Sequence, residues 1–274
     1  IISLVALVLS IQITLDSLNP AFAMPIKLRM IAKRVLALSK SGTTPIVVTD
    51  LDETIIDSTA RKYYSMRKAA ESLCTTQFDT DTSSYCMAIK GVNIDEIYQL
   101  PNRYDLRDLF RRLNLVDSSF TDAVIKKTNS IYLSGSFLEL DQATPGSVEF
   151  IDTLEKMGAL VFYVSSRFKE TQFEGTVQSL HSLGILAKNA RAEYNVFLRP
   201  SEMPSLEFKK QSFDRIKSIS EKIGGVVSLV MENEPENMNA MMETFPQADA
   251  IFVEGAQLKS EPLKGDPVRI RTFR

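Results

Sequence analysis

Short apolar runs rich in β-branched residues recur along the chain, separated by stretches with helical periodicity. The runs cover residues 45–49, 159–165, 226–231 and 250–253. Runs of this length without polar alternation are typical of strands buried on both faces of a parallel sheet. Helices are predicted at 144–158, 170–181 and 206–223 and from Pro235, the first with Thr144 as N-cap and Pro145 opening it. This order predicts an α/β fold with a doubly wound parallel sheet.

Residues 58–143 interrupt the alternation of strands and helices. The segment is polar and contains amphipathic pieces such as RKYYSMRKAAESL and DLRDLFRRL. We therefore expect a mainly helical cap inserted after the first strand, with a core formed by residues 24–57 and 144–274.

The first 23 residues have the features of an export signal. Residues 1–15 are apolar and uncharged but too short to span a bilayer comfortably, and Ala21 and Ala23 form a small-x-small cleavage pattern. We expect a signal peptide over 1–23 and an exported, periplasmic or secreted protein. A retained anchor is the alternative, and it would be the protein's only contact with a membrane. In an oxidising compartment, Cys74 and Cys86 are able to form a disulfide.

Composition narrows the class of partners. The 274 residues are 44% hydrophobic and 24% charged, as in globular proteins, and 32 basic against 34 acidic residues give a net charge of −2. With a pI near 5.7, the chain lacks the basic character of a nucleic-acid-binding protein. We expect neither a nucleic acid nor an anionic membrane surface as partner.

Polar residues with catalytic potential follow the predicted strands. Asp50 and Asp52 come directly after the first strand, Ser165 ends the second, and Glu232 follows the third. Ligands bind at the carboxyl ends of strands in open α/β sheets, so these side chains are expected to converge. Carboxylates from two strand ends suit Mg²⁺. An Asp can form an aspartyl-phosphate, and a second Asp two residues later can transfer protons.

Two segments resemble the haloacid-dehalogenase superfamily of aspartate-nucleophile phosphatases, and specifically its exported class B and class C acid phosphatases. They are VVTDLDETIID at 47–57 and VFYVSSR at 161–167. The resemblance implies a Rossmann-like core with Asp50 as nucleophile and magnesium ligand. Asp52 would be the general acid/base and a ligand through its backbone carbonyl, while Thr54 would support the loop and Ser165 would bind the transferred phosphoryl group.

The same family has a lysine at a helix start and two acids four residues apart after a strand. Lys209 and Lys210 both qualify as the lysine, with Lys209 preferred because Phe213 and Ile216 place it on the apolar face of its helix. Glu232 and Glu236 match the acid pair as magnesium ligands, although the family more often begins this motif with Gly-Asp. Asn233 or Glu234 is the alternative ligand to Glu232, whose side chain is one methylene longer than the family's Asp.

The predicted function is Mg²⁺-dependent hydrolysis of small phosphomonoesters through a phosphorylated Asp50. The alternatives are a non-catalytic phosphate-binding or storage protein of the same fold, and a phosphoprotein phosphatase, which the size of the predicted cap disfavours. Neither the physiological substrate nor the oligomeric state follows from the sequence.

Overall fold

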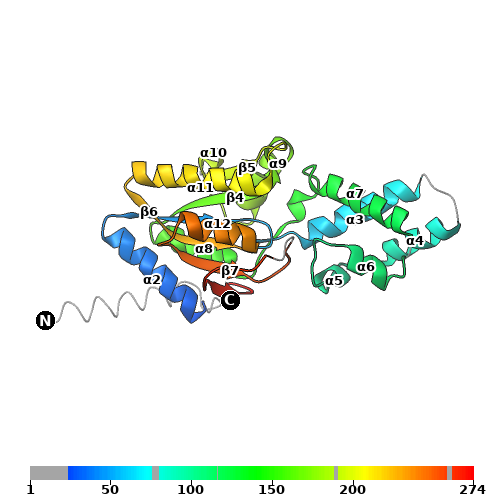
Figure 1. The fold of residues 1–274 in the computed structure, drawn as a ribbon, viewed down its shortest axis with the longest axis horizontal. Helices are drawn as coiled ribbons and strands as arrows, with labels where there is room; N and C mark the ends of the chain where they lie inside the picture. Colours follow the sequence, from blue (N-terminus) through cyan, green and yellow to red (C-terminus); the bar gives the residue numbers. More distant parts are fainter. Residues whose placement is uncertain (1–23, 76–79, 116, 188–190, 258–260) are drawn as a thin grey trace.

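The computed structural model describes residues 24–75, 80–115, 117–187, 191–257 and 261–274. Within them, six strands form one sheet in which all neighbouring strands are parallel (Figure 1). In spatial order the strands are β5 (Val196–Arg199), β4 (Leu160–Phe168), β1 (Thr44–Thr49), β6 (Gly225–Glu232), β7 (Asp249–Val253) and β8 (Val268–Ile270). The four predicted strands are β1, β4, β6 and β7. The edge strands β5 and β8 are additional, and they are too short to show a periodicity in the sequence.

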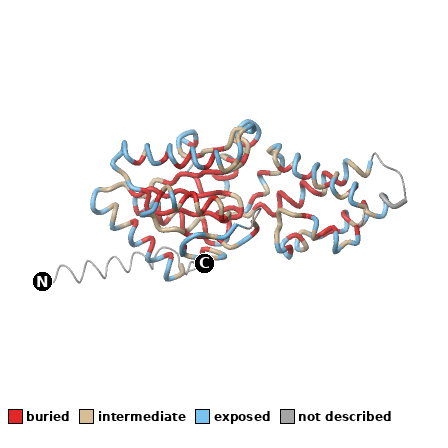
Figure 2. Tube along the Cα trace, viewed as in Figure 1, coloured by how far each residue is buried: buried red, intermediate tan, exposed pale blue. Residues whose placement is uncertain are grey.

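Helices cover both faces of this sheet. One face packs against α2 (Ile26–Lys40), α8 (Ser147–Lys156) and α9 (Lys169–Ser182), and the other against α11 (Ser205–Lys222) and α12 (Pro235–Thr244). The side chains of β1 alternate between the two faces of the sheet. Val47 belongs to the first apolar core and Val48 to the second. Figure 2 shows the buried positions concentrated in the sheet. The predicted doubly wound α/β fold is confirmed.

Two of these helices differ from the sequence-based expectation. Helix α2 is additional, and its buried residues Leu28, Ile31, Ala32 and Val35 follow helical spacing. Helix α8 starts at Ser147 rather than at Pro145, so the predicted Thr144 cap is wrong. The reason is tertiary, because the Thr144 N–H donates to the Ile55 carbonyl oxygen at 3.0 Å, which keeps this segment extended beside the loop after β1.

The segment predicted as a cap forms a separate helical layer at one end of the core (Figure 1). Its elements are α3 (Thr59–Cys74), α4 (Thr80–Gly91), α5 (Ile94–Tyr98), α6 (Arg107–Arg112), α7 (Ser118–Tyr132) and the 3₁₀ helix η1 (Leu138–Leu140). These helices bury an apolar cluster of their own, which includes Met66, Ile89 and Leu109. An antiparallel pair, β2 (Ile56–Asp57) and β3 (Gln142–Ala143), connects this layer to the sheet.

A disulfide joins Cys74 at the end of α3 to Cys86 in α4, with their Cα atoms 5.9 Å apart. It confirms the pairing considered from the sequence. The predicted signal peptide, residues 1–23, lies outside the described residues. Among the residues that are described, no helix combines the length and the apolar character needed to cross a membrane. The short helix α10 (Ala192–Asn195) completes the fold before β5.

Candidate active site

Asp50 lies where β1 ends, at the carboxyl edge of the sheet. Its N–H donates to the Met231 carbonyl oxygen at 3.0 Å, which extends the β1–β6 pairing and fixes the backbone at this point. The residue is 5% exposed. Its Oδ1 accepts a hydrogen bond of 2.7 Å from Lys209 Nζ, and its Oδ2 accepts one of 3.2 Å from Thr54 Oγ1. Thr54 thus contacts the carboxylate of Asp50 directly.

A tight turn after Asp50 brings the next carboxylate to the same edge. Glu53 has a φ of 59°, the left-handed region, and the N–H groups of Thr54, Ile55 and Ile56 all donate to the Leu51 carbonyl oxygen. The turn reverses the chain within a few residues. As a result Asp52 points toward the same cavity as Asp50.

Lys209 links Asp50 to the end of β6. Its Nζ lies 2.5 Å from Glu232 Oε2, and Glu232 Oε1 accepts the N–H groups of Asn233 and Glu234 at 3.0 Å each. Lys209 is 2% exposed and Glu232 is fully buried. The ammonium group thus sits between two carboxylates that come from neighbouring strands.

These contacts shift the pKa values of Asp50 and Lys209. Burial and the charge of Glu232 raise the pKa of Asp50 to about 7, against the lowering effect of Lys209. Burial by itself lowers the pKa of Lys209, but Asp50 and Glu232 outweigh it and raise that pKa above its ordinary value. Lys209 therefore stays cationic, whereas Asp50 is close to balanced between its two protonation states at neutral pH.

Asp52 has a different environment, because two arginines hold its carboxylate. Arg167 at the end of β4 donates to both carboxylate oxygens, at 3.0 and 2.7 Å, and Arg61 of α3 approaches Oδ1 at 2.5 Å. Burial alone would raise the pKa of Asp52, but the two guanidinium groups lower it well below its usual range. A carboxyl group with so low a pKa neither keeps a proton for donation nor takes one readily from water. The predicted acid/base role therefore needs the arginines to separate from Asp52.

Asp141, just before β3, completes this cluster. It accepts from Arg167 Nη2 at 2.6 Å, and its Oδ1 lies 3.0 Å from Arg61 Nε without hydrogen-bond alignment. Arg61 also donates to the hydroxyl of Tyr132 at 2.9 Å. Sequence reasoning did not single out Arg61, Asp141 or Arg167 as site residues. Only Arg167 had a signal, since it ends the VSSR segment, while Arg61 and Asp141 lie far apart in sequence.

Asp50 and Asp52 open into a cavity of about 280 Å³ between the sheet edge and the cap. The predicted residues Ser165, Lys209 and Glu232 also line it. The remaining lining residues are Tyr104, Tyr132, Leu133, Ser166, Arg167, Gln172, Arg199, Ser205, Asn233, Glu234 and Asn237. The structure thus brings together residues from four strand ends, from the starts of α9, α11 and α12, and from the cap.

Two predicted site residues lie elsewhere. Lys210 is exposed and does not line the cavity, because one step along α11 turns its side chain away from the buried face that carries Lys209. Glu236 is in the first turn of α12, where Asn237 rather than Glu236 reaches the cavity. The alternatives Asn233 and Glu234 do line it.

The predicted magnesium set of Asp50, Asp52, Glu232 and Glu236 is not assembled as a whole. In the part of the chain that the structure describes, no three His, Cys, Asp or Glu side chains are placed to hold a metal ion. Asp50 and Glu232 remain as two buried carboxylates that contact the same ammonium group. Proteins often bind Mg²⁺ through one or two carboxylates, with waters and substrate phosphate as the other ligands. This donor pair fits that reduced set.

No family model matches the chain, and no curated protein matches its sequence. Solved structures that resemble it include a predicted phosphoglycolate phosphatase from Haemophilus somnus 129PT (13% identity, 84% of this chain and 95% of that chain, TM-score 0.48). A haloacid dehalogenase-like hydrolase from Streptococcus pneumoniae has 12% identity over 78% of this chain and 86% of its own, with a TM-score of 0.44. The class C acid phosphatase from Bacillus anthracis has 14% identity over 74% and 61%, with a TM-score of 0.35. These likenesses are distant, so the chemistry is inferred from the residues of this chain.

Proposed function

We propose that this protein is a phosphatase of the haloacid-dehalogenase superfamily that hydrolyses small phosphomonoesters through a phosphorylated Asp50. The observation that carries the proposal is the buried Asp50 carboxylate, 2.7 Å from the Lys209 ammonium group, with Asp52 and Ser165 lining the same cavity. A buried carboxylate beside a fixed cation at the wall of a cavity is suited to attack on a phosphoryl group.

The reaction has two steps. A carboxylate oxygen of Asp50 forms a bond to phosphorus while the P–O ester bond breaks, and water then hydrolyses the aspartyl-phosphate to release inorganic phosphate. Lys209 stabilises the charge on the phosphoryl oxygens, and Ser165, 1% exposed at the end of β4, is placed to donate a hydrogen bond to them. Once the two arginines separate from Asp52, its carboxyl group gives a proton to the leaving oxygen as the ester bond breaks. It then takes a proton from the attacking water, so the substrate leaves as its alcohol and Asp52 returns to its starting state.

Asp50 and Glu232 are the residues that would hold Mg²⁺. When bound, the cation would offset the negative charge of the two carboxylates and of the phosphoryl group. The backbone carbonyl of Asp52 and the side chain of Asn233 are further oxygen donors in this loop region, as the family resemblance suggests for Asp52.

The size of the cavity supports a small phosphorylated substrate rather than a phosphoprotein. The cavity measures about 280 Å³, and cap residues such as Tyr104 and Tyr132 form one of its walls. Location outside the reducing cytosol, periplasmic or secreted, belongs to the same proposal. The Cys74–Cys86 disulfide supports it, since disulfides persist in oxidising compartments.

Hydrolysis of p-nitrophenyl phosphate by the purified protein, with and without Mg²⁺, tests the proposal. We expect Asp50→Asn to lower kcat by about 10³-fold or more, because it removes the nucleophile. Lys209→Met should also cause a large loss, whereas Lys210→Met, its exposed neighbour, should keep wild-type activity.

Acid quenching during turnover should trap phosphate on the peptide that carries Asp50. Full activity of a folded Asp50→Asn protein would overturn the mechanism. Tight phosphate binding without hydrolysis of any phosphomonoester would instead favour the non-catalytic binding or storage protein.

A further inference from the structure

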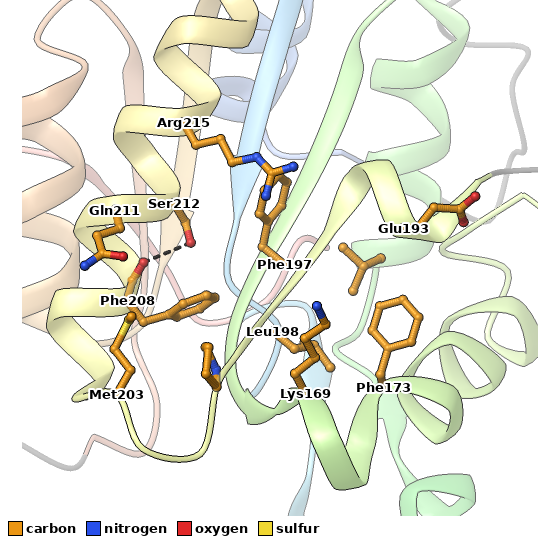
Figure 3. Close-up of a pocket in the computed structure, with 12 residues that line it drawn as sticks. Lys169, Phe173, Glu193, Phe197, Leu198, Met203, Phe208, Gln211, Ser212 and Arg215 are labelled. Carbon is orange, nitrogen blue, oxygen red and sulfur yellow. Dashed lines mark hydrogen bonds between the residues drawn. The ribbon is translucent and has the colours of Figure 1, made fainter.

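A second cavity, larger than the one at Asp50, lies beside the edge strand β5 (Figure 3). Its volume is about 430 Å³, within the range of small-molecule sites. The start of α9, the strand β5, the loop that follows it and the outer side of α11 form its walls. The lining residues are Lys169, Phe173, Glu193, Val196, Phe197, Leu198, Pro200, Met203, Phe208, Gln211, Ser212 and Arg215.

The inner surface of this cavity combines apolar and polar side chains in nearly equal share. Three aromatic rings, from Phe173, Phe197 and Phe208, line it together with Met203 and Leu198. The cavity forms because β5 is a sheet edge, so α9 and α11, which cover opposite faces of the sheet, have no further strand between them here. The aromatic and aliphatic part of this surface favours a ligand with an aromatic or alkyl body.

Two cations face this apolar space. Figure 3 shows the Lys169 amino group and the Arg215 guanidinium group directed toward the cavity from opposite walls, while the Glu193 carboxylate points away from it. The Arg215 guanidinium lies over the Phe197 ring, 4.9 Å from its centre. Neither Lys169 nor Arg215 makes an ion pair with any residue that the structure describes. The local charge is therefore complementary to an anion.

We propose that this cavity binds a small amphipathic anion, with its apolar body against Phe173, Phe197 and Phe208 and its anionic group between Lys169 and Arg215. The site is separate from the proposed catalytic centre, because none of its lining residues lines the cavity at Asp50. The proposal thus stands or fails independently of the phosphatase activity.

The two cavities nevertheless share the connection between β5 and α11. Arg199, which lines the catalytic cavity, donates to the carbonyl oxygen of Met203, which lines the second cavity, at 2.7 Å. Phe208 of the second cavity directly precedes Lys209 of the first. A ligand in the second cavity would therefore lie against Met203 and Phe208, which adjoin Arg199 and Lys209 of the catalytic cavity.

The test compares two fluorescent probes of similar aromatic shape, the anion 1-anilinonaphthalene-8-sulfonate and the neutral N-phenyl-1-naphthylamine, titrated into the whole folded protein. We expect saturable 1:1 binding of the anion. The double substitution Lys169→Gln and Arg215→Gln should weaken the affinity for the anionic probe about tenfold or more. It should change the affinity for the neutral probe by less than about twofold. Both side chains are exposed, so the double variant is expected to fold.

Two further variants separate charge from shape. Lys210→Gln with Lys217→Gln removes two exposed lysines of α11 that do not line the cavity, and it should bind the anion like wild type. Gln211→Trp, at the cavity wall, should weaken the binding of both probes because the larger side chain fills the space. Unchanged anion binding by the Lys169→Gln, Arg215→Gln protein would overturn the proposal. Displacement of the anionic probe by inorganic phosphate would also overturn it, and so would loss of probe binding in Asp50→Asn. Either result would place the probe in the catalytic cavity.

Discussion

Two buried lysines show how strongly a residue's function depends on its neighbours. Lys209 lies between the carboxylates of Asp50 and Glu232, and its pKa is raised. Lys62 of α3 donates instead to the neutral Asn129 Oδ1 at 2.9 Å. Burial, together with the nearby charge of Arg61, lowers the pKa of Lys62 to about 8. Lys209 is therefore a permanent cation, whereas Lys62 loses its charge at moderately alkaline pH.

This difference predicts a pH-dependent stability for Lys62. Its pKa is near 8 in the folded state against an ordinary 10.5, so the folded state binds fewer protons between these values. Stability should therefore rise as pH increases from about 8 to about 10.5, relative to Lys62→Met, by roughly 2–3 kcal/mol at most. Urea unfolding of both proteins across this range measures the effect.

The matched control is Lys68→Met, which removes an exposed lysine from the same helix. It should follow the wild-type pH profile. A Lys62→Met protein whose stability changes with pH as the wild type's does would show that Lys62 is charged in the fold throughout.

At the scale of elements, the cluster around Asp52 connects parts that are distant in sequence. Asp52 follows β1, Arg167 ends β4, Arg61 is in α3 and Asp141 precedes β3. Two carboxylates balance two guanidinium groups in a buried environment, so removal of one member leaves an uncompensated charge. The cluster therefore ties the cap helix α3 to the carboxyl edge of the sheet.

A double-mutant cycle tests this connection. We expect Arg61→Met and Asp141→Asn each to destabilise the protein by about 3 kcal/mol, and the pair to show a coupling energy of about 1–3 kcal/mol. Urea denaturation gives the free energy of unfolding of the wild type, the two single variants and the double variant. Arg67→Met, on the same helix, removes a side chain that donates to Tyr63 and not to this cluster, so it should cost far less and show no coupling to Asp141→Asn.

At the scale of the whole molecule, the cap and the sheet have separate apolar cores. Met66, Ile89 and Leu109 belong to the cap cluster, and they are not members of either cluster that packs on the sheet. The disulfide between Cys74 and Cys86 lies wholly within the cap, between α3 and α4. Its stabilising effect should therefore be local to the cap.

Replacement of both cysteines by serine should lower the stability of the cap by about 2–4 kcal/mol, because the cross-link restricts the unfolded chain. We expect limited proteolysis to cleave the variant first within residues 58–143, while fragments of the sheet domain survive longer. Wild-type protein with reductant should behave like the variant. Equal protease resistance of variant and wild type would contradict a stabilising role for the disulfide.

The sequence by itself determined the main features of the fold and much of the candidate site. Buried β-branched runs separated by helices indicate a doubly wound sheet, and polar residues after such strands must meet at its carboxyl edge. For this reason Asp50, Asp52, Ser165 and Glu232 were predictable from local patterns, and they line one cavity.

Only the tertiary structure decided which side chains complete that site. The preference for Lys209 over Lys210 already followed from the apolar face of its helix, but the exclusion of Glu236 depends on how α12 is rotated against the sheet. The contacts of Arg61 with Asp52 depend on how the cap packs on the core, and the cavity beside β5 exists because a sheet edge lies between two helices. Such features arise from packing between distant segments, and local sequence patterns carry no information about it.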